Sequence, residues 1–358
     1  MQYKRIIIKV GTNVITQENG LLNEPVLKEL VSQIAQLKKK GAEVVLVSSG
    51  AMGAGRPFVR LREKCNRVLE RQILAAVGQT RLMNTYDRLL QKHGFLCAQV
   101  LATKEDFRDR RHYLNMKSCL EGLLQDEILP IVNENDVISV SELMFTDNDE
   151  LAGLLSAMLN VEALIILSTV DGVMDRDPKE KGAKVISVVK PKHKNIHEGI
   201  TSEKSLFGRG GMLTKCRIAE RMSKLGITTH IANGKTKNIL LDIFNNKSAG
   251  TLFPPAKKVS GIKKWIAHAE GQERGIAIVN KCAEEVLVAK DKAASLLPVG
   301  ITKVTGDFEK GDIIRVENEK GKRVALGVAQ YSSQKAKEFI GKSGKKPLIH
   351  YDYLFIIN

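Results

Sequence analysis

The chain has 358 residues, of which 43% are hydrophobic and 27% are charged, and its formal net charge is +16. This length is comfortable for two domains with a sizeable buried core, and the composition excludes extended disorder. No apolar run is long enough to cross a bilayer, and the N-terminus lacks the pattern of a secretory signal, so we expect a cytoplasmic protein with no membrane partner. The excess of positive charge favours anionic partners in general.

The cysteines exclude a disulfide framework and a zinc site. They are odd in number, widely separated and never arranged as Cys-x-x-Cys. We therefore interpret all five as reduced thiols: Cys65, Cys97, Cys119, Cys216 and Cys282.

Strand-like apolar runs alternate with helical patterns up to about residue 250. The first run, Ile6 to Ile8, is followed by a predicted helix that Asn23 caps and Gly41 ends. The alternation continues with predicted strands at 43–48, 95–103, 128–133 and 163–168, and predicted helices at 66–92, 114–125 and 149–159. This order indicates βαβ units, and therefore an α/β fold in which helices cover both faces of a mainly parallel sheet.

Polar and glycine-rich stretches follow the predicted strands, at the edge where ligands bind in sheets of this kind. They are "KVGTN" (9–13), "SSGAMGAG" (48–55), "NENDV" (133–137), "TDNDELA" (146–152) and "STVDGVMDRDP" (168–178), while "RGGMLTK" (209–215) precedes an amphipathic helix. Each stretch has an ordinary structural explanation when it is taken alone, such as a glycine turn or a helix cap. Only the combination of these stretches indicates a function.

Taken together, these stretches provide a site for a triphosphate and a zwitterionic acceptor. Lys9 and Lys215 would meet at a glycine-lined helix N-terminus, which suits the β and γ phosphates. A second set fits the ammonium and carboxylate groups of an acceptor: Ser49, Asn133, Asp136, Asn148 and Asp149. Because a carboxylate acceptor is already ionised at neutral pH, no histidine is needed as a general base.

Six motifs in order carry a family resemblance: "IIIKVGTNVIT", "LVSSGAMGAG", "VNENDVIS", "FTDNDELAGLLSAML", "DGVMDRDP" and "GRGGMLTKCRIAERM". Through them the chain resembles the amino acid kinase family along nearly its whole length. The resemblance implies a three-layer sandwich around an eight-stranded, mostly parallel sheet. It also implies transfer of a phosphoryl group from ATP, with Mg²⁺, to the γ-carboxylate of L-glutamate, the first step of proline biosynthesis.

The resemblance also implies roles for individual residues. Lys9 and Lys215 look like the lysines that neutralise the transferred phosphoryl group, and Asp149 like the carboxylate that orients them. Asp147 resembles a residue that helps to hold Mg²⁺. The implied glutamate contacts are Ser49, Gly50, Asn133, Asp136 and Asn148. The implied ATP contacts are Lys9, Gly11, Ser168, Thr169, Arg209, Gly210, Gly211, Met212, Leu213, Thr214 and Lys215.

Two positions depart from the usual family pattern. Relatives commonly carry Thr-Asp after the strand that ends here, where this chain has Ser168-Thr169-Val170-Asp171. Arg209 stands where a small residue is frequent, and it adds a positive charge near the phosphates.

The C-terminal part is a different kind of sequence. We predict a kinase domain at 1–255, a linker at 256–270 and a small β-barrel at 271–358. From residue 256 onward the chain has 19 Lys and Arg against 12 Asp and Glu, so the C-terminal part is basic. The strand candidates are "GIAIVN", "VLVAK", "ITKVTG", "DIIRVEN", "VALGVAQY" and "YLFIIN". The middle of this region resembles the PUA domain, so RNA is one expected partner, and the alternative is a regulatory or assembly module.

Two other functions stay open at this point. One is a different activity of the same family, with acetylglutamate, carbamate or uridylate as acceptor. The other is an RNA-binding protein with a vestigial kinase domain. A homodimer or homotetramer, and feedback inhibition by proline, are further expectations that the resemblance implies.

Overall fold

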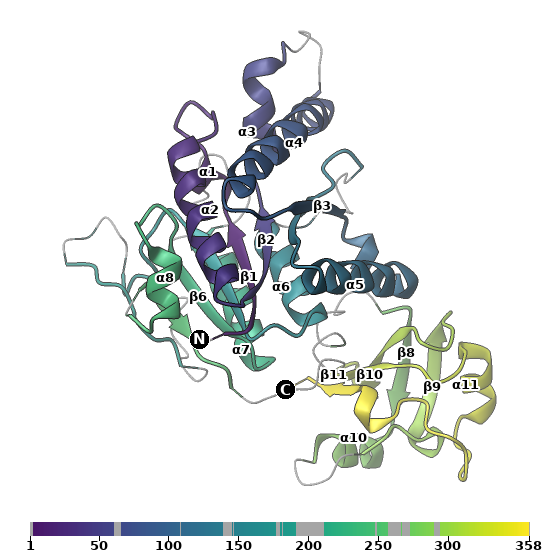
Figure 1. The fold of residues 1–358 in the computed structure, drawn as a ribbon. Coiled ribbons are helices and arrows are strands. Elements are labelled where there is room, and N and C mark those ends of the chain that lie inside the picture. The colour runs from purple at the N-terminus through teal and green to yellow at the C-terminus, as the bar shows by residue number, and fades with distance from the viewer. Residues whose placement is uncertain are drawn as a thin grey trace. The chain divides into compact units, whose positions relative to one another are not determined.

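The computed structural model describes residues 3–60, 66–107, 109–138, 145, 147–176, 180, 182–190, 211–247, 249–256, 266, 273–289 and 294–357. The chain forms two compact units, Met1–Asp106 with Leu114–Lys258, and Phe107–Tyr113 with Val259–Asn358. Each unit has its own sheet (Figure 1). None of the helices in the described part is both long and apolar enough to span a membrane.

The sheet of the first unit has seven strands within the described residues, in the order β3-β4-β2-β1-β5-β6-β7. Their bounds are β1 Arg5–Val10, β2 Glu43–Ser48, β3 Cys97–Ala102, β4 Leu129–Glu134, β5 Ala163–Ser168, β6 Thr228–Asn233 and β7 Thr251–Phe253. The first six run parallel and β7 pairs antiparallel with β6, which confirms the predicted, mostly parallel sheet. Val188 makes a single parallel bridge to Leu252 of β7, but the described residues contain no eighth strand of this sheet.

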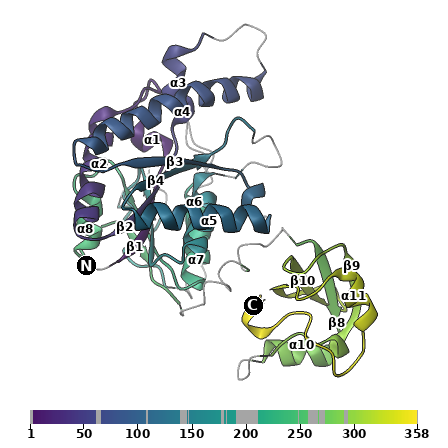
Figure 2. The same cartoon turned by 45° about the vertical axis from the view of Figure 1, so that its right-hand side comes forward.

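Helices cover both faces of this sheet (Figures 1 and 2). Alternate residues of β1 point to opposite faces, because side chains in a strand alternate. Ile6, Ile8 and Val10 join the core that α1, α2 and α8 complete, whereas Lys9 lies on the face covered by α6 and α7. The helices are α1 Thr12–Ile15, α2 Glu24–Lys39, α3 Ala51–Gly55, α4 Arg67–Gln91, α5 Arg110–Gln125, α6 Asn148–Met158, α7 Met212–Lys224 and α8 Ile239–Phe244.

The predicted start of α2 is confirmed in detail. Asn23 is its N-cap, and the side-chain oxygen accepts a hydrogen bond from the backbone N–H of Val26 at 3.3 Å. Gly41 has a φ of 85° just after the helix, a conformation that favours glycine. Cap and stop therefore fix the ends of the helix that packs on β2.

Helix α4 approaches the α3 segment so closely that their backbones touch. A Cβ at Gly78 would lie 1.7 Å from the Ala51 carbonyl oxygen, and one at Gly55 would lie 2.1 Å from the Leu74 carbonyl oxygen. Both positions therefore require glycine. Because α3 begins directly after the loop of Ser49 and Gly50, the contact holds α4 beside that loop.

The second unit contains a separate five-stranded sheet in the order β12-β11-β10-β8-β9. Its strands are β8 Gly275–Val279, β9 Ile301–Gly306, β10 Ile313–Asn318, β11 Arg323–Val328 and β12 Leu354–Ile356. Five of the six predicted strands are confirmed, and the expected C-terminal β unit is present. β8 and β10 pair in parallel, whereas the other pairs are antiparallel.

The prediction of a strand at "VLVAK" (286–290) is wrong. Val286, Leu287 and Val288 belong to helix α10, Lys281–Val288, and Leu287 is the buried residue of that helix. Asn280 caps it by accepting a hydrogen bond from the N–H of Ala283 at 2.9 Å. A short apolar run does not distinguish a strand from the apolar side of a helix, and the cap three residues before Ala283 was the signal that decided it.

Replacing Gly78 by alanine is expected to destabilise the first unit by about 2 kcal/mol or more, because the new methyl group meets backbone atoms that cannot move aside alone. Chemical denaturation measures this loss. Gly122→Ala is the matched control: Gly122 lies in α5 with no heavy atom within 4 Å of the added Cβ, so this change should stabilise by about 0.5–1 kcal/mol. Equal stability of the two variants would refute the close-contact explanation.

Candidate active site

Two lysines and one aspartate meet at the carboxyl edge of the sheet. Lys9 belongs to β1, Asp149 to the first turn of α6, and Lys215 to the first turn of α7. The Lys9 Nζ lies 2.7 Å from Asp149 Oδ1, and the Lys215 Nζ lies 2.8 Å from Asp149 Oδ2. All three side chains are buried, and Asp149 is 0% exposed. The structure thus brings together the two lysines that the sequence separates by about 200 residues, as expected.

The charges of this cluster do not cancel. Burial alone would raise the pKa of Asp149, but the ammonium groups of Lys9 and Lys215 lower it to about 2. Burial would also lower the pKa of Lys215, but the attraction of Asp149 raises it. The cluster therefore carries two cations on one carboxylate, and the remaining positive charge is suited to an anion.

Asp147 caps α6 with one oxygen and leaves the other without a partner. Its Oδ1 accepts hydrogen bonds from the N–H groups of Asp149 and Glu150 at 2.9 and 3.1 Å. Its Oδ2 is buried and has no hydrogen-bond partner among the described residues. Burial and the neighbouring Asp149 charge raise the pKa of Asp147 to about 6. A buried carboxylate oxygen of this kind fits a hard cation such as Mg²⁺.

The amide of Asn148 ties three segments together beside the cluster. Its Nδ2 donates to the Ser49 Oγ and to the Asn133 Oδ1, both at 2.9 Å, and to the Ser48 carbonyl oxygen at 3.2 Å. Gly50 follows with a φ of 99°, so the chain turns sharply at this loop. Three of the predicted acceptor residues, Ser49, Asn133 and Asn148, are thus in direct contact.

Asp136 lies on the same β4 side and is paired with Arg71 of α4. The Arg71 Nη2 is 3.4 Å from the Asp136 Oδ1. Burial raises the pKa of Asp136, and the charge of Arg71 opposes that rise. The sequence predicted Asp136 as an acceptor contact but gave no indication of Arg71.

The predicted nucleotide residues surround the ends of β1, β5 and α7. The Gly11 N–H donates to the Leu167 carbonyl oxygen at 3.3 Å, and a Cβ at Gly11 would lie 3.6 Å from the Lys9 Nζ. Ser168 ends β5, and Thr169 is exposed just beyond it. Gly211 is the N-cap of α7, and the first four residues of that helix are Met212, Leu213, Thr214 and Lys215. Arg209 and Gly210 lie outside the described residues.

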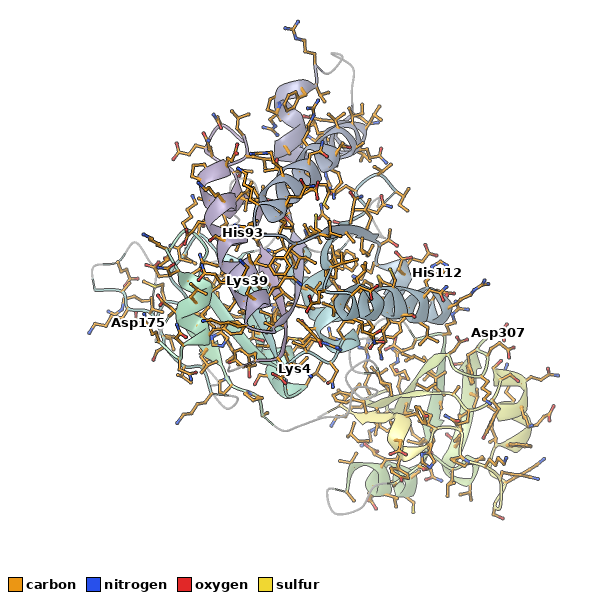
Figure 3. All side chains as sticks on the ribbon, in the orientation of Figure 1. Lys4, Lys39, His93, His112, Asp175 and Asp307 are labelled. Carbon is orange, nitrogen blue, oxygen red and sulfur yellow. The ribbon has the colours of Figure 1, made fainter. Side chains whose placement is uncertain are left out.

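Within the part of the chain that the structure describes, no histidine forms a hydrogen bond or ion pair with Lys9, Asp149 or Lys215. Figure 3 labels His93, which follows the end of α4 and is half-buried, and His112, which lies on α5 and is exposed. His230 is buried on β6, where its Nε2 is 2.9 Å from the Tyr3 hydroxyl. Burial lowers its pKa to about 4, so it is neutral at physiological pH. The four described cysteines are free, as interpreted from the sequence.

Sequence reasoning missed two further polar contacts of this site. The Gln79 Oε1 of α4 accepts a hydrogen bond from the Asn133 Nδ2 at 2.9 Å. The Glu134 Oε1 accepts one from the Phe145 N–H, also at 2.9 Å. A glutamine inside a helical pattern gives no signal of its own. The neighbouring Gly78 was an indirect one, because a glycine within a helix can mark a place where another backbone approaches closely.

Comparisons with known proteins agree with this architecture. A sequence model described as "Amino acid kinase family" matches residues 4–233, and one described as "PUA domain" matches residues 275–351. The glutamate 5-kinase of Chlorobaculum tepidum is 52% identical over 355 residues, which cover 99% of this chain and 98% of that protein. The glutamate 5-kinase of Bacteroides thetaiotaomicron is 48% identical over 358 residues, covering 99% of each chain.

Solved structures show the same fold in the kinase unit. Carbamate kinase from Giardia lamblia bound to AMP-PNP matches with a TM-score of 0.53 at 19% identity, over 71% of this chain and 99% of that one. UMP kinase from Bacillus anthracis matches with a TM-score of 0.50 at 17% identity, over 72% and 99%. The sandwich of helices around a mostly parallel sheet, the family match over residues 4–233 and relatives of about half-identical sequence lead to one conclusion: this chain belongs to the amino acid kinase family.

Proposed function

We propose that this protein transfers the γ-phosphoryl group of ATP to the γ-carboxylate of L-glutamate and releases L-glutamyl 5-phosphate and ADP. The observation that carries the proposal is the Lys9–Asp149–Lys215 cluster, which lies next to the amide-linked loops of Ser49 and Asn133. The curated relatives that cover the whole chain are glutamate 5-kinases, which supports glutamate as the acceptor.

The acceptor side provides groups for both charges of an amino acid. Asp136 is a carboxylate that can hold an ammonium group. Because the Ser49 Oγ accepts a hydrogen bond from Asn148, its hydroxyl hydrogen is available to donate to a carboxylate. The loop of Ser49 and Gly50 therefore suits the α-carboxylate, and the γ-carboxylate would extend toward the lysines.

Phosphoryl transfer requires positioning and charge neutralisation more than proton transfer. An oxygen of the ionised γ-carboxylate attacks the γ-phosphorus, a new O–P bond forms, and the bond from phosphorus to the β,γ-bridging oxygen breaks, leaving its electrons on ADP. Lys9 and Lys215 neutralise the equatorial oxygens during this exchange. Asp149, ionised because of its two lysine partners, keeps both ammonium groups at fixed positions before and after the transfer.

Mg²⁺ fits the residue that stands beside these lysines. Asp147 would hold it through its Oδ2, the buried oxygen without a partner among the described residues, while Oδ1 stays committed to capping α6. When bound, the ion would supply positive charge that neutralises the phosphates of ATP.

One feature argues for a free amino acid over the other acceptors of the family, and a second argues against a vestigial kinase site. An N-acetylated acceptor has no ammonium group, so it would gain nothing from the half-buried carboxylate of Asp136. A vestigial site would be expected to lose the buried lysines, because two cations on one carboxylate are costly to keep inside a fold. RNA at the C-terminal unit, a homodimer or homotetramer, inhibition by proline and a cytoplasmic location stay predictions.

The experiment that tests the proposal incubates the full chain with ATP, Mg²⁺ and hydroxylamine while the acceptor is varied. L-glutamate is expected to give a hydroxamate, because hydroxylamine traps an acyl phosphate. N-acetylglutamate, carbamate and UMP are the comparison acceptors, with ADP release as a common readout. Turnover with one of those acceptors and none with glutamate would withdraw the assignment.

Loss of either lysine should reduce kcat strongly. Lys9→Ala or Lys215→Ala is expected to lower kcat by about 100-fold or more, because each removes one cation from the transferred group. Steady-state kinetics at saturating ATP and glutamate measure this. Lys104→Ala is the matched control, since Lys104 pairs with Glu150 at 3.0 Å, one residue beyond Asp149, and should change kcat less than twofold. A kcat within threefold of wild type in both active-site variants would contradict the mechanism.

Asp147→Asn should separate stability from function. Burial and Asp149 raise the pKa of Asp147 from 3.8 to about 6, so its ionised form costs stability above about pH 6, and this cost disappears as the pH falls below about 4. The variant keeps an oxygen that caps α6. We expect a higher Tm than wild type at pH 8, no difference at pH 4, and a higher Mg²⁺ concentration for half-maximal activity.

The control for this prediction has the opposite sign. The Asp109 pKa is lowered, chiefly by the backbone N–H of His112, so Asp109→Asn should not stabilise the protein at pH 8. Thermal denaturation across pH and a Mg²⁺ titration of activity are the two measurements. An Asp147→Asn variant that is less stable than wild type at pH 8 would show that the ionised carboxylate is favourable in the fold.

A further inference from the structure

A chain of hydrogen-bonded amides runs from α4 into the acceptor site. Gln79 accepts from Asn133, Asn133 accepts from Asn148, and Asn148 donates in turn to the Ser49 Oγ, with each of these contacts at 2.9 Å. The mechanism above uses the last two residues of this chain and leaves Gln79 without a role.

Two backbone groups fix the directions of the asparagine amides: the Glu134 N–H for Asn133 and the Ser48 carbonyl oxygen for Asn148. The Glu134 N–H donates to the Asn133 Oδ1 at 2.9 Å, and a backbone N–H can only donate. The Asn133 Nδ2 must therefore point at Gln79, whose Oε1 accepts it. The same Oδ1 also accepts a hydrogen bond from the Asn148 Nδ2, so the Asn148 nitrogen faces Asn133.

This direction decides what the site offers to a ligand. The two hydrogens of the Asn148 Nδ2 are shared among Ser48, Ser49 and Asn133, so Asn148 has only its Oδ1 left, which is an acceptor for an ammonium group. The Ser49 hydroxyl, which accepts from Asn148, has its hydrogen left to donate to a carboxylate.

Gln79 has no evident structural purpose besides this acceptor contact. Its Nε2 is buried and has no hydrogen-bond partner among the described residues, an unfavourable arrangement for folding. Its position is nevertheless tightly set, because the preceding Gly78 presses against the Ala51 carbonyl oxygen. A second contact, between the Tyr86 hydroxyl and the Ser48 Oγ at 2.9 Å, holds the same helix to the end of β2.

We propose that Gln79 is a positioning residue for the acceptor: by accepting from the Asn133 Nδ2 it holds the Asn133 amide together with the Glu134 N–H, and the Asn133 Oδ1 in turn places Asn148 beside Ser49. The inference rests on the proposed function, because it assumes an acceptor with both an ammonium and a carboxylate group. Gln79 acts through Asn133 and does not itself contact the acceptor.

The test is Gln79→Met, which keeps the length of the side chain and removes its acceptor. We expect the KM for L-glutamate to rise about fivefold, the factor for one neutral hydrogen bond, while the KM for ATP and kcat stay within twofold. The variant exchanges one buried unpaired donor, the Gln79 Nε2, for another, the Asn133 Nδ2. Its Tm should therefore stay within about 3 °C of wild type, which a purely structural role would not allow.

A double-mutant cycle with Asn133→Ala identifies the route of the effect. If Gln79 acts through Asn133, adding Gln79→Met to Asn133→Ala should change the KM for glutamate by less than twofold. Gln91→Met is the matched control on the same helix, because Gln91 is exposed and its Nε2 donates to Asp87, and it should leave all constants unchanged.

The outcomes separate the two proposals. Wild-type protein that does not turn over glutamate overturns the proposed function, and this inference with it. If the wild type is active but Gln79→Met leaves the KM for glutamate unchanged, raises both KM values equally, or adds fully to Asn133→Ala, the positioning role alone is overturned.

Discussion

The site depends on one buried carboxylate shared between two ammonium groups. Asp149 holds Lys9 and Lys215 at hydrogen-bond distance, and these three side chains come from β1, α6 and α7. Because an unpaired charge inside a protein is strongly unfavourable, the three elements are tied to a common geometry at the edge of the sheet. The remaining positive charge makes the same arrangement receptive to a phosphoryl group, so one interaction both fixes the geometry of the site and favours binding of the anion.

Around this centre the polar groups are separated by function. Acceptors and donors for an amino acid lie on the β2 and β4 side, where Asn148 links Ser49 to Asn133. Gly11 and Gly211, two of the glycines predicted to contact ATP, lie on the β1 and α7 side. Helix α6 takes part in both, since Asp147, Asn148 and Asp149 occupy successive positions at its start, and a helix turns by about 100° per residue. Three neighbouring residues can therefore face a metal, an amino acid and two lysines.

Much of this could be predicted because the signals are local. β2 and β5 were placed at the correct residues because a strand buried on both faces is a continuous apolar run. Lys9 was noticed because a lysine at the end of such a run is unusual, whereas the place of Asp149 between the two lysines was implied only by the family resemblance. The contribution of α4 could not be predicted, since the pairing of Gln79 with Asn133 depends on how a long helix docks. The helix at 281–288 was misassigned because its apolar run is too short to show a helical period.

The contact between Gly55 and Gly78 also limits how this pocket can change. Two backbones that already touch cannot come closer, and any side chain added at either position forces the whole of α4 outward. The spacing between α4 and the segment that follows Ser49 is thus set by main-chain geometry. Substitutions among the polar side chains beside Ser49 would alter which groups are recognised, whereas admitting a much bulkier molecule would require the helix itself to move.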